Sequence, residues 1–119
     1  IQEFMPEIRH GELSMIFIHG EFSHAISKRP KTGEFRVNLA YEGQHERVFP
    51  PGNLIDQARA IVRTLPEPPL FARVDGVVRG GGRLFVIEVE LNEPDLYFDH
   101  APEQAEVFAK AIDDLVRER

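Results

Sequence analysis

The sequence predicts an α+β fold, in which a mainly antiparallel sheet is covered by two helices in the order β-β-β-α-β-β-α. Two observations support this class. Short apolar runs of strand length alternate with turn sequences, which favours hairpins. Two other segments place apolar residues at helical spacing. The 119 residues fit one domain, and 42% hydrophobic residues, with nine phenylalanines among them, suffice for one core.

Three strands are expected in the first part of the chain, over residues 14–18, 22–27 and 34–39. His19-Gly20-Glu21 joins the first two as a hairpin. Residues 28–33 form a basic loop, because Pro30 and Gly33 interrupt regular structure. Residues 42–52 are polar and end in Pro-Pro-Gly, so we predict a loop there.

A helix is predicted to begin after Asn53, the expected N-cap, and to end before Pro66. Its apolar positions are Leu54, Ala58, Ile61, Val62 and Leu65. Two strands follow, at residues 70–78 and 84–91. The glycines at 80–82 between them indicate a hairpin turn better than a phosphate-binding loop, since no helix and no Lys-Ser/Thr ending follows.

The last helix is predicted to open at Pro102, a residue suited to a first helical turn. Its apolar stripe consists of Ala105, Phe108, Ala109, Ile112, Leu115 and Val116.

Three carboxylates lie on the two strands of the second hairpin: Asp75, Glu88 and Glu90. Strand side chains alternate between faces, so Glu88 and Glu90 point the same way. Clustered carboxylates repel one another and need a positive partner, and Mg²⁺ prefers oxygen ligands. Three exposed charges on a solvated face are the alternative interpretation, and Asn92 competes with Glu90 as third ligand.

Arg36 and Arg73 differ from the basic loop at residues 28–31, because each lies inside a predicted strand. Arginine binds phosphate oxygens through a bidentate fork and stays charged when buried. Arg73 precedes Asp75 by two residues and should project from the same face. A cation, a carboxylate and a metal together are the ingredients of phosphoryl transfer.

Composition excludes several classes of site and partner. The chain has no cysteine, so disulfides, thiolate zinc sites and cysteine nucleophiles are excluded, and a cytoplasmic location is expected. No apolar run approaches the roughly 20 residues of a membrane span. The net charge of −6 disfavours nucleic acid as a partner. The sequence begins with Ile1 instead of Met, so we expect it to start inside a larger protein.

Several segments, in one order over nearly the whole chain, form a family pattern: Gln2-Glu3-Phe4-Met5, Gly11-Glu12-Leu13-Ser14, Ser23-His24-Ala25 with Lys28-Arg29-Pro30-Lys31, Gly33-Glu34-Phe35-Arg36-Val37-Asn38, Arg73-Val74-Asp75-Gly76 and Glu88-Val89-Glu90. With them the chain resembles the C-terminal part of an ATP-grasp enzyme. The nearest branch is the one of glutathione synthetases and ribosomal-protein glutamate ligases. The stretch from Glu88 to Pro94, with the Ala-Pro helix after it, resembles the cycloserine-forming ligases especially.

This resemblance implies ATP and Mg²⁺, with Mn²⁺ as an alternative, as cofactors. It places adenine against Glu3, Phe4 and Met5, and the ribose at Glu12. It makes Asp75, Glu88 and Glu90 the metal ligands. It puts Arg36 and Arg73 near the transferred phosphate and the acyl phosphate, and Asn38 among the binding residues where substrate contacts occur.

The activity implied is that of an ATP-dependent carboxylate-amine ligase acting through an acyl phosphate. The N-terminal and lid domains of such an enzyme should lie before residue 1, so residues 1–119 would be its C-terminal subdomain and inactive alone. The expected partners are a small-molecule carboxylate and an amine, with no nucleic acid and no membrane; a homo-oligomer stays open. The alternatives are a non-catalytic ATP-grasp-like binding or interaction module and a plain cation-binding domain. The joint presence of Glu12, Arg36, Asp75, Glu88 and Glu90 favours the ligase.

Overall fold

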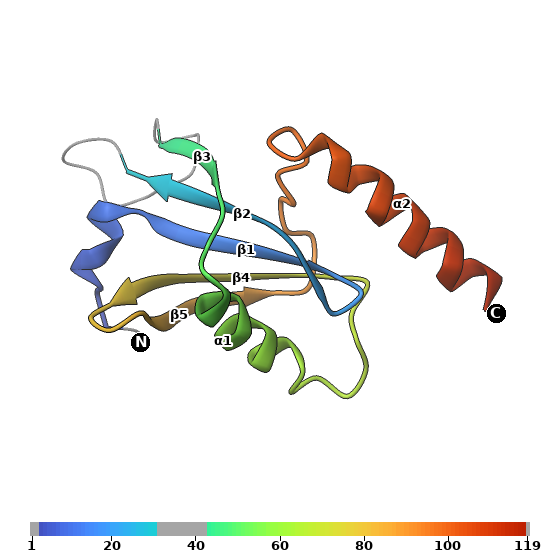
Figure 1. Ribbon diagram of the computed structural model, residues 1–119, viewed down its shortest axis with the longest axis horizontal. Helices are drawn as coiled ribbons and strands as arrows, with labels where there is room; N and C mark the ends of the chain where they lie inside the picture. The colour runs from blue at the N-terminus through green and yellow to red at the C-terminus, as the bar shows by residue number, and fades with distance from the viewer. Residues whose placement is uncertain (1–2, 31–42, 119) are drawn as a thin grey trace.

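A computed structural model of the chain describes residues 3–30 and 43–118. Within these residues the chain forms one five-stranded sheet in the order β3-β2-β1-β4-β5, and all neighbouring strands are antiparallel (Figure 1). The strands are β1 (Glu12–Ile18), β2 (Glu21–Arg29), β3 (Gln44–Val48), β4 (Phe71–Arg79) and β5 (Arg83–Glu90). The helices are the 3-10 helix η1 (Pro6–His10), α1 (Gly52–Val62) and α2 (Pro102–Arg117). The predicted α+β class is therefore confirmed.

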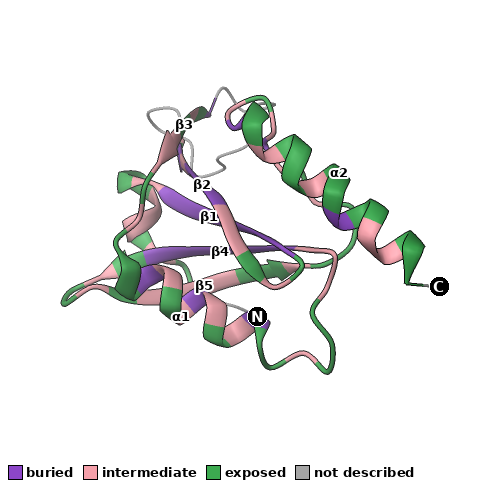
Figure 2. Cartoon of the chain, turned by 45° about the vertical axis from the view of Figure 1, so that its right-hand side comes forward, coloured by how far each residue is buried: buried purple, intermediate pink, exposed green. Residues whose placement is uncertain are grey.

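The hydrophobic core lies between the sheet and α1. Strand β1 is the central strand, and all of its residues are buried; in Figure 2, β1 and β4 form a mostly buried band. Alternate residues of the strands meet three residues of α1 at four-residue intervals. The cluster comprises Leu13, Met15, Phe17, Ala25, Ala72 and Val74 from the strands, and Leu54, Ala58 and Val62 from α1. The predicted apolar face of this helix is thus largely the one that packs.

A β-bulge in β5 decides which of its side chains face α1. Asp75 pairs with Glu88, whereas the next residue, Gly76, pairs with Val86, so Ile87 is an extra residue. An extra residue resets the alternation of side chains between the two faces. Val86 therefore packs against the core on the α1 side, while Glu88 lies on the opposite face with Asp75.

The same bulge explains the glycine at position 76. A Cβ atom there would lie 2.6 Å from the carbonyl oxygen of Phe85, closer than real Cβ atoms come. Gly76 thus allows the two backbones to approach beside the three carboxylates.

The opposite face of the sheet is covered only in part. At one end, α2 packs through Phe108, whose ring lies 6.2 Å from that of Phe71 and 5.4 Å from that of Phe98. Figure 1 shows α2 running away from the sheet, and Ala111 is its one buried residue within the described part. Of the predicted stripe, Val116 is 67% exposed. No helix in the described ranges has the length and apolarity needed to cross a bilayer.

The boundaries differ from the sequence prediction in several places. The predicted loop over residues 42–52 is wrong, because β3 lies inside it and pairs with β2. Strand β3 is a polar edge strand, so it lacks the apolar alternation that announces a strand. The strand expected over residues 34–39 lies outside the described residues. Asn53 is not the N-cap; α1 begins at Gly52 with Pro51 as its N-cap, two residues earlier than predicted, and the Asn53 amide donates to the Gly82 carbonyl oxygen over 3.3 Å.

Candidate functional site

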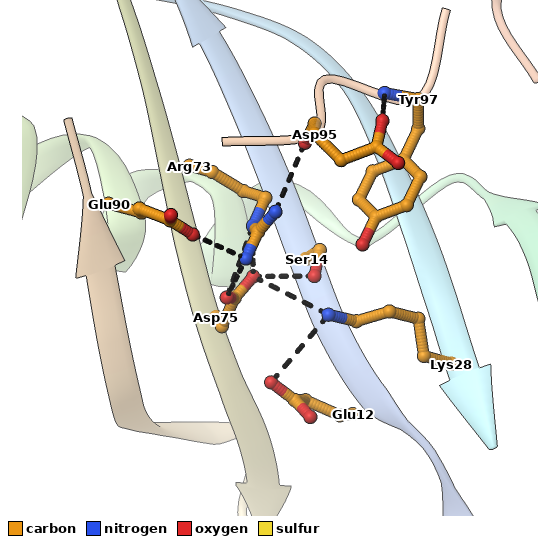
Figure 3. A network of polar contacts seen from close by, with 8 residues as sticks. All are labelled: Glu12, Ser14, Lys28, Arg73, Asp75, Glu90, Asp95 and Tyr97. Atoms are coloured by element: carbon orange, nitrogen blue, oxygen red, sulfur yellow. Dashed lines mark hydrogen bonds and ion pairs between the residues drawn. The ribbon is translucent and has the colours of Figure 1, made fainter. Parts of the chain in front are cut away.

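The face of the sheet opposite α1 carries ionisable residues from four strands (Figure 3). On β4, Asp75 pairs with Glu88 on one side and with Ser14 on the other. Arg73 pairs with Glu90, two residues along the same strands. We use the name charged site for the set Glu12, Ser14, Lys28, Arg73, Asp75, Glu88 and Glu90.

Arg73 and Asp75 form the centre of the charged site. The Arg73 Nε atom donates to both Asp75 carboxylate oxygens, over 3.0 and 3.1 Å, and Nη2 donates to Oδ2 over 2.9 Å. Nη2 also donates to Glu90 over 2.8 Å, and the Ser14 hydroxyl donates to Asp75 Oδ1 over 2.5 Å. Burial opposes the Arg73 charge, but the hydrogen bonds and charge of Asp75 outweigh it and raise the pKa of Arg73.

Lys28 supplies a second cation from β2. Its Nζ atom lies 3.8 Å from a Glu12 carboxylate oxygen and 4.0 Å from Asp75 Oδ1, and only 5% of the residue is exposed. Glu12 is buried as well. Burial raises the pKa of Glu12, Lys28 lowers it, and the nearby Asp75 raises it again; the net direction is upward.

The segment after β5 crosses this face, and its consecutive residues Asp95, Leu96 and Tyr97 each contact the sheet. Arg73 Nη1 donates to the Asp95 carbonyl oxygen over 3.1 Å, and the buried His24 lies 2.7 Å from the Leu96 carbonyl oxygen through Nε2. The Tyr97 ring packs with Ile16 and Ile26. Burial raises the pKa of Tyr97 to about 12, so its hydroxyl stays protonated at neutral pH.

Asp75, Glu88 and Glu90 offer one ligand oxygen each within 4.8 Å of one another. This donor set consists of carboxylates alone, which suits a hard cation such as Mg²⁺. The described carboxylates of the charged site are Glu12, Asp75, Glu88 and Glu90, and its described cations are Lys28 and Arg73. With all four carboxylates ionised, these described residues carry a net charge of −2, which a divalent cation would neutralise.

Most of the predicted site residues that the structure describes lie together. Asp75, Glu88, Glu90, Arg73 and Glu12 are all in the charged site, from three strands.

The other predicted residues lie elsewhere. Arg36 and Asn38 lie outside the described residues, so their roles stay predictions. Glu3, Phe4 and Met5 precede η1 and are not among the residues of the network in Figure 3. Asn92 follows the end of β5 and is exposed.

The sequence does not identify two members of the charged site, Ser14 and Lys28, or the neighbouring Tyr97. Lys28 was assigned to the basic loop because the predicted strand ended too early; β2 continues to Arg29. With that extension Lys28 alternates with His24 and shares its face, which is the signal that could have found it. Tyr97 gave no comparable signal, since its segment is irregular.

Comparison of sequences finds the same family along most of the chain. The family model described as prokaryotic glutathione synthetase, ATP-grasp domain, matches residues 1–89. The glutathione synthetase of Bradyrhizobium diazoefficiens is 37% identical over 86 residues, which are 72% of this chain and 23% of that protein. That of Parasynechococcus marenigrum is 31% identical over 85 residues, 71% of this chain and 24% of its own length. The chain thus spans about a quarter of these relatives.

Solved structures of a synthetase and of a ligase have the same arrangement. D-cycloserine synthetase DcsG superposes with a TM-score of 0.79 and 28% identity, covering 95% of this chain and 41% of that one. A D-alanine–D-alanine ligase from Bacillus anthracis, solved in complex with ATP, superposes with a TM-score of 0.60 over 90% of this chain and 37% of that one. At 22% identity, the second match shows likeness of fold alone.

Proposed function

Because this chain belongs to the ATP-grasp domain family of prokaryotic glutathione synthetases, we propose that it supplies the metal- and ATP-binding half of an ATP-dependent carboxylate-amine ligase. The observation that carries the proposal is the charged site itself. A sheet face with three clustered carboxylates beside two buried cations can hold a divalent cation and a polyphosphate at the same place.

Asp75, Glu88 and Glu90 are the residues that would hold the metal. Bound there, Mg²⁺ or Mn²⁺ would supply charge neutralisation for the phosphates of ATP. Asp75 is already oriented by Ser14 and by Arg73, so its oxygens keep one direction. Glu88 is exposed and can approach a ligand from the solvent side.

Lys28 and Arg73 bind and orient the anionic groups. Arg73 stays charged because Asp75 raises its pKa, and its fork matches the geometry of phosphate and carboxylate. Both cations lie on the one face that holds the carboxylates, so they would stabilise negative charge on the transferred group.

The reaction proposed for this site has two steps. A substrate carboxylate oxygen forms a bond to the γ-phosphorus of ATP while the bond to the β-phosphate oxygen breaks and ADP leaves. An amine then attacks the carbon of the acyl phosphate; the carbon–nitrogen bond forms, inorganic phosphate leaves, and the amine loses a proton. No side-chain nucleophile is required, which agrees with the lack of cysteine.

The test uses the full-length protein and a non-hydrolysable ATP analogue with Mg²⁺. We expect calorimetric binding by the wild-type protein and by Glu106→Gln, an exposed carboxylate on α2 far along the sequence from the cluster. Asp75→Asn and Glu88→Gln should lose metal-dependent binding and ATP turnover while they stay folded. Equal binding by all four proteins would refute the metal assignment. No binding by the wild-type protein at millimolar ligand would favour the non-catalytic module.

A further inference from the structure

We infer that Tyr97 is a positioning residue of the charged site, whose ring holds the Lys28 ammonium and the Arg73 guanidinium in place for a polyphosphate. The inference rests on the proposed function only for the identity of that anion. It concerns a residue outside the carboxylate cluster, in the irregular segment that follows β5.

The first observation is that the ring lies close to two cations. The Lys28 Nζ atom and the Arg73 Cζ atom each lie 5.7 Å from the Tyr97 ring centroid. Both distances are within the range of about 6 Å at which an aromatic face attracts a cation. Figure 3 shows the phenol on the same side of the sheet as both cations. One ring therefore contacts the two residues that we assign to anion binding.

The second observation is that Lys28 has weak directional restraint without the ring. Its two carboxylate partners among the described residues, Glu12 and Asp75, lie at 3.8 and 4.0 Å, which is longer than a hydrogen bond. A lysine ammonium is a point charge on a flexible stem, so such contacts attract it without fixing its direction. An aromatic face beside the stem and the ammonium restricts where the charge can go.

The third observation is backbone strain at the same residue. Tyr97 has a φ angle of 55°, in the left-handed region that bulky residues rarely adopt. Its N–H donates to Asp95 Oδ1 over 2.8 Å, and the His45 ring meets the Tyr97 ring edge-on at 5.5 Å. Strained residues persist where their surroundings over-determine them, and they gather at functional sites. The strained backbone at Tyr97 accompanies the placement of its ring next to Lys28 and Arg73.

The test titrates inorganic tripolyphosphate with Mg²⁺ onto the full-length protein and three variants at Tyr97. Tyr97→Phe keeps the ring, Tyr97→Leu removes it, and Tyr97→Asn removes it while tolerating the left-handed backbone. We expect Tyr97→Leu and Tyr97→Asn to bind tripolyphosphate roughly ten-fold more weakly than the wild-type protein, and Tyr97→Phe to bind it with wild-type affinity. Phe98→Leu is the control, because Phe98 packs on Phe108 and His24.

Two further readouts separate positioning from general loss of structure. Mn²⁺ affinity should change much less than tripolyphosphate affinity, because among the described residues Tyr97 makes no hydrogen bond or ring contact to Asp75, Glu88 or Glu90. The Arg73 Nε–H signal in NMR spectra should exchange faster with solvent in the Leu and Asn variants than in the Phe variant. A parallel fall in Mn²⁺ affinity would show a structural role only and overturn the inference.

The remaining outcomes also decide the question. Wild-type affinity in Tyr97→Leu and Tyr97→Asn, or no tripolyphosphate binding by the wild-type chain, would contradict the positioning role. A Phe variant as weak as the Leu variant would assign the effect to the hydroxyl and overturn the role of the ring. If tripolyphosphate binding depends on the ring but the ATP analogue does not bind, the proposed function fails and the inference about Tyr97 stands.

Discussion

The two faces of this sheet come from the same strands, but one face buries apolar side chains and the other carries charged residues. On the α1 face, Met15, Phe17 and Val74 are fully buried against the helix and contact apolar atoms. On the other face, Asp75 is 1% exposed and Arg73 is 8% exposed, yet both are ionisable residues, and they are hydrogen-bonded to each other. Neighbouring residues on one strand, such as Val74 and Asp75, therefore belong to environments with different energetics.

The apolar face stabilises the fold, and the charged face is the one that we propose for binding. Burying apolar side chains stabilises a fold by about 25 cal/mol per Å². Burying charges costs free energy that their pairing only partly returns. A chain that places carboxylates on a sheet face beside a packed core therefore has a stability cost there, and the metal and ATP binding that we propose would account for it.

The largest effect on stability should come from the α1 face. Phe17→Ala removes a fully buried ring that packs edge-on against Phe22 at a centroid distance of 5.9 Å. We expect a loss of about 3–5 kcal/mol in the free energy of unfolding, from lost burial and the cavity left behind. Urea denaturation followed by circular dichroism measures it. A loss below about 1 kcal/mol would mean that this face is not the stabilising one.

Removing the central cation of the charged site should have an intermediate effect on stability and an opposite effect on metal binding. Arg73→Gln leaves Asp75 with fewer partners, and we expect a loss of about 2–3 kcal/mol, below the full cost of a broken buried pair because Glu90 is partly exposed.

The same variant should bind Mn²⁺ more tightly, because a positive charge beside the three carboxylates is gone. Calorimetric titration measures this change, and Arg79→Gln, whose partner is Glu7, is the matched control. Weaker Mn²⁺ binding in Arg73→Gln would show that Arg73 organises the ligands more than it competes for their charge.

A smaller effect on the free energy of unfolding is expected from the protonation of His24, which lies on the same sheet face as Lys28. Burial lowers the pKa of His24 below its usual 6.5, although the hydrogen bond with Leu96 opposes this. The unfolded chain therefore takes up a proton first as the pH falls. The stability due to neutral His24 is complete above pH 6.5 and is lost as the pH falls through the lower folded-state pKa.

Urea titrations between pH 7.5 and pH 5 measure this dependence. His24→Gln should show a shallower loss of stability toward acid than the wild-type chain, because it cannot take up the proton. Identical slopes for the two proteins would remove His24 as the cause.

How far the sequence predicts this site depends on the kind of structure involved. Strand alternation places Glu88 and Glu90 on one face, and the short hairpin brings Asp75 opposite Glu88. Alternation alone cannot reveal the bulge at Ile87, because an extra residue shows only when two strands are paired.

The residues that the sequence interpretation missed are those that depend on tertiary contacts. To identify Lys28 one must know where β2 ends, and the ends of elements are the boundaries that a sequence predicts least well. To identify Tyr97 one must know how the irregular segment after β5 crosses the sheet. Contacts with Arg73 and His24, which are distant in sequence, fix that path. Strand β3 is not predicted because its residues are mostly polar and it lies at the edge of the sheet.

The most direct test of the division between the two faces compares one variant from each in the same two measurements. Glu88→Gln removes an exposed residue that we propose as a metal ligand, and Val62→Ala shortens a buried side chain of α1. We predict that Glu88→Gln abolishes Mn²⁺ binding and changes the free energy of unfolding by less than about 0.5 kcal/mol. Val62→Ala should cost about 2 kcal/mol and leave the Mn²⁺ affinity unchanged. Mn²⁺ binding that survives in Glu88→Gln, or that falls in Val62→Ala, would contradict the account.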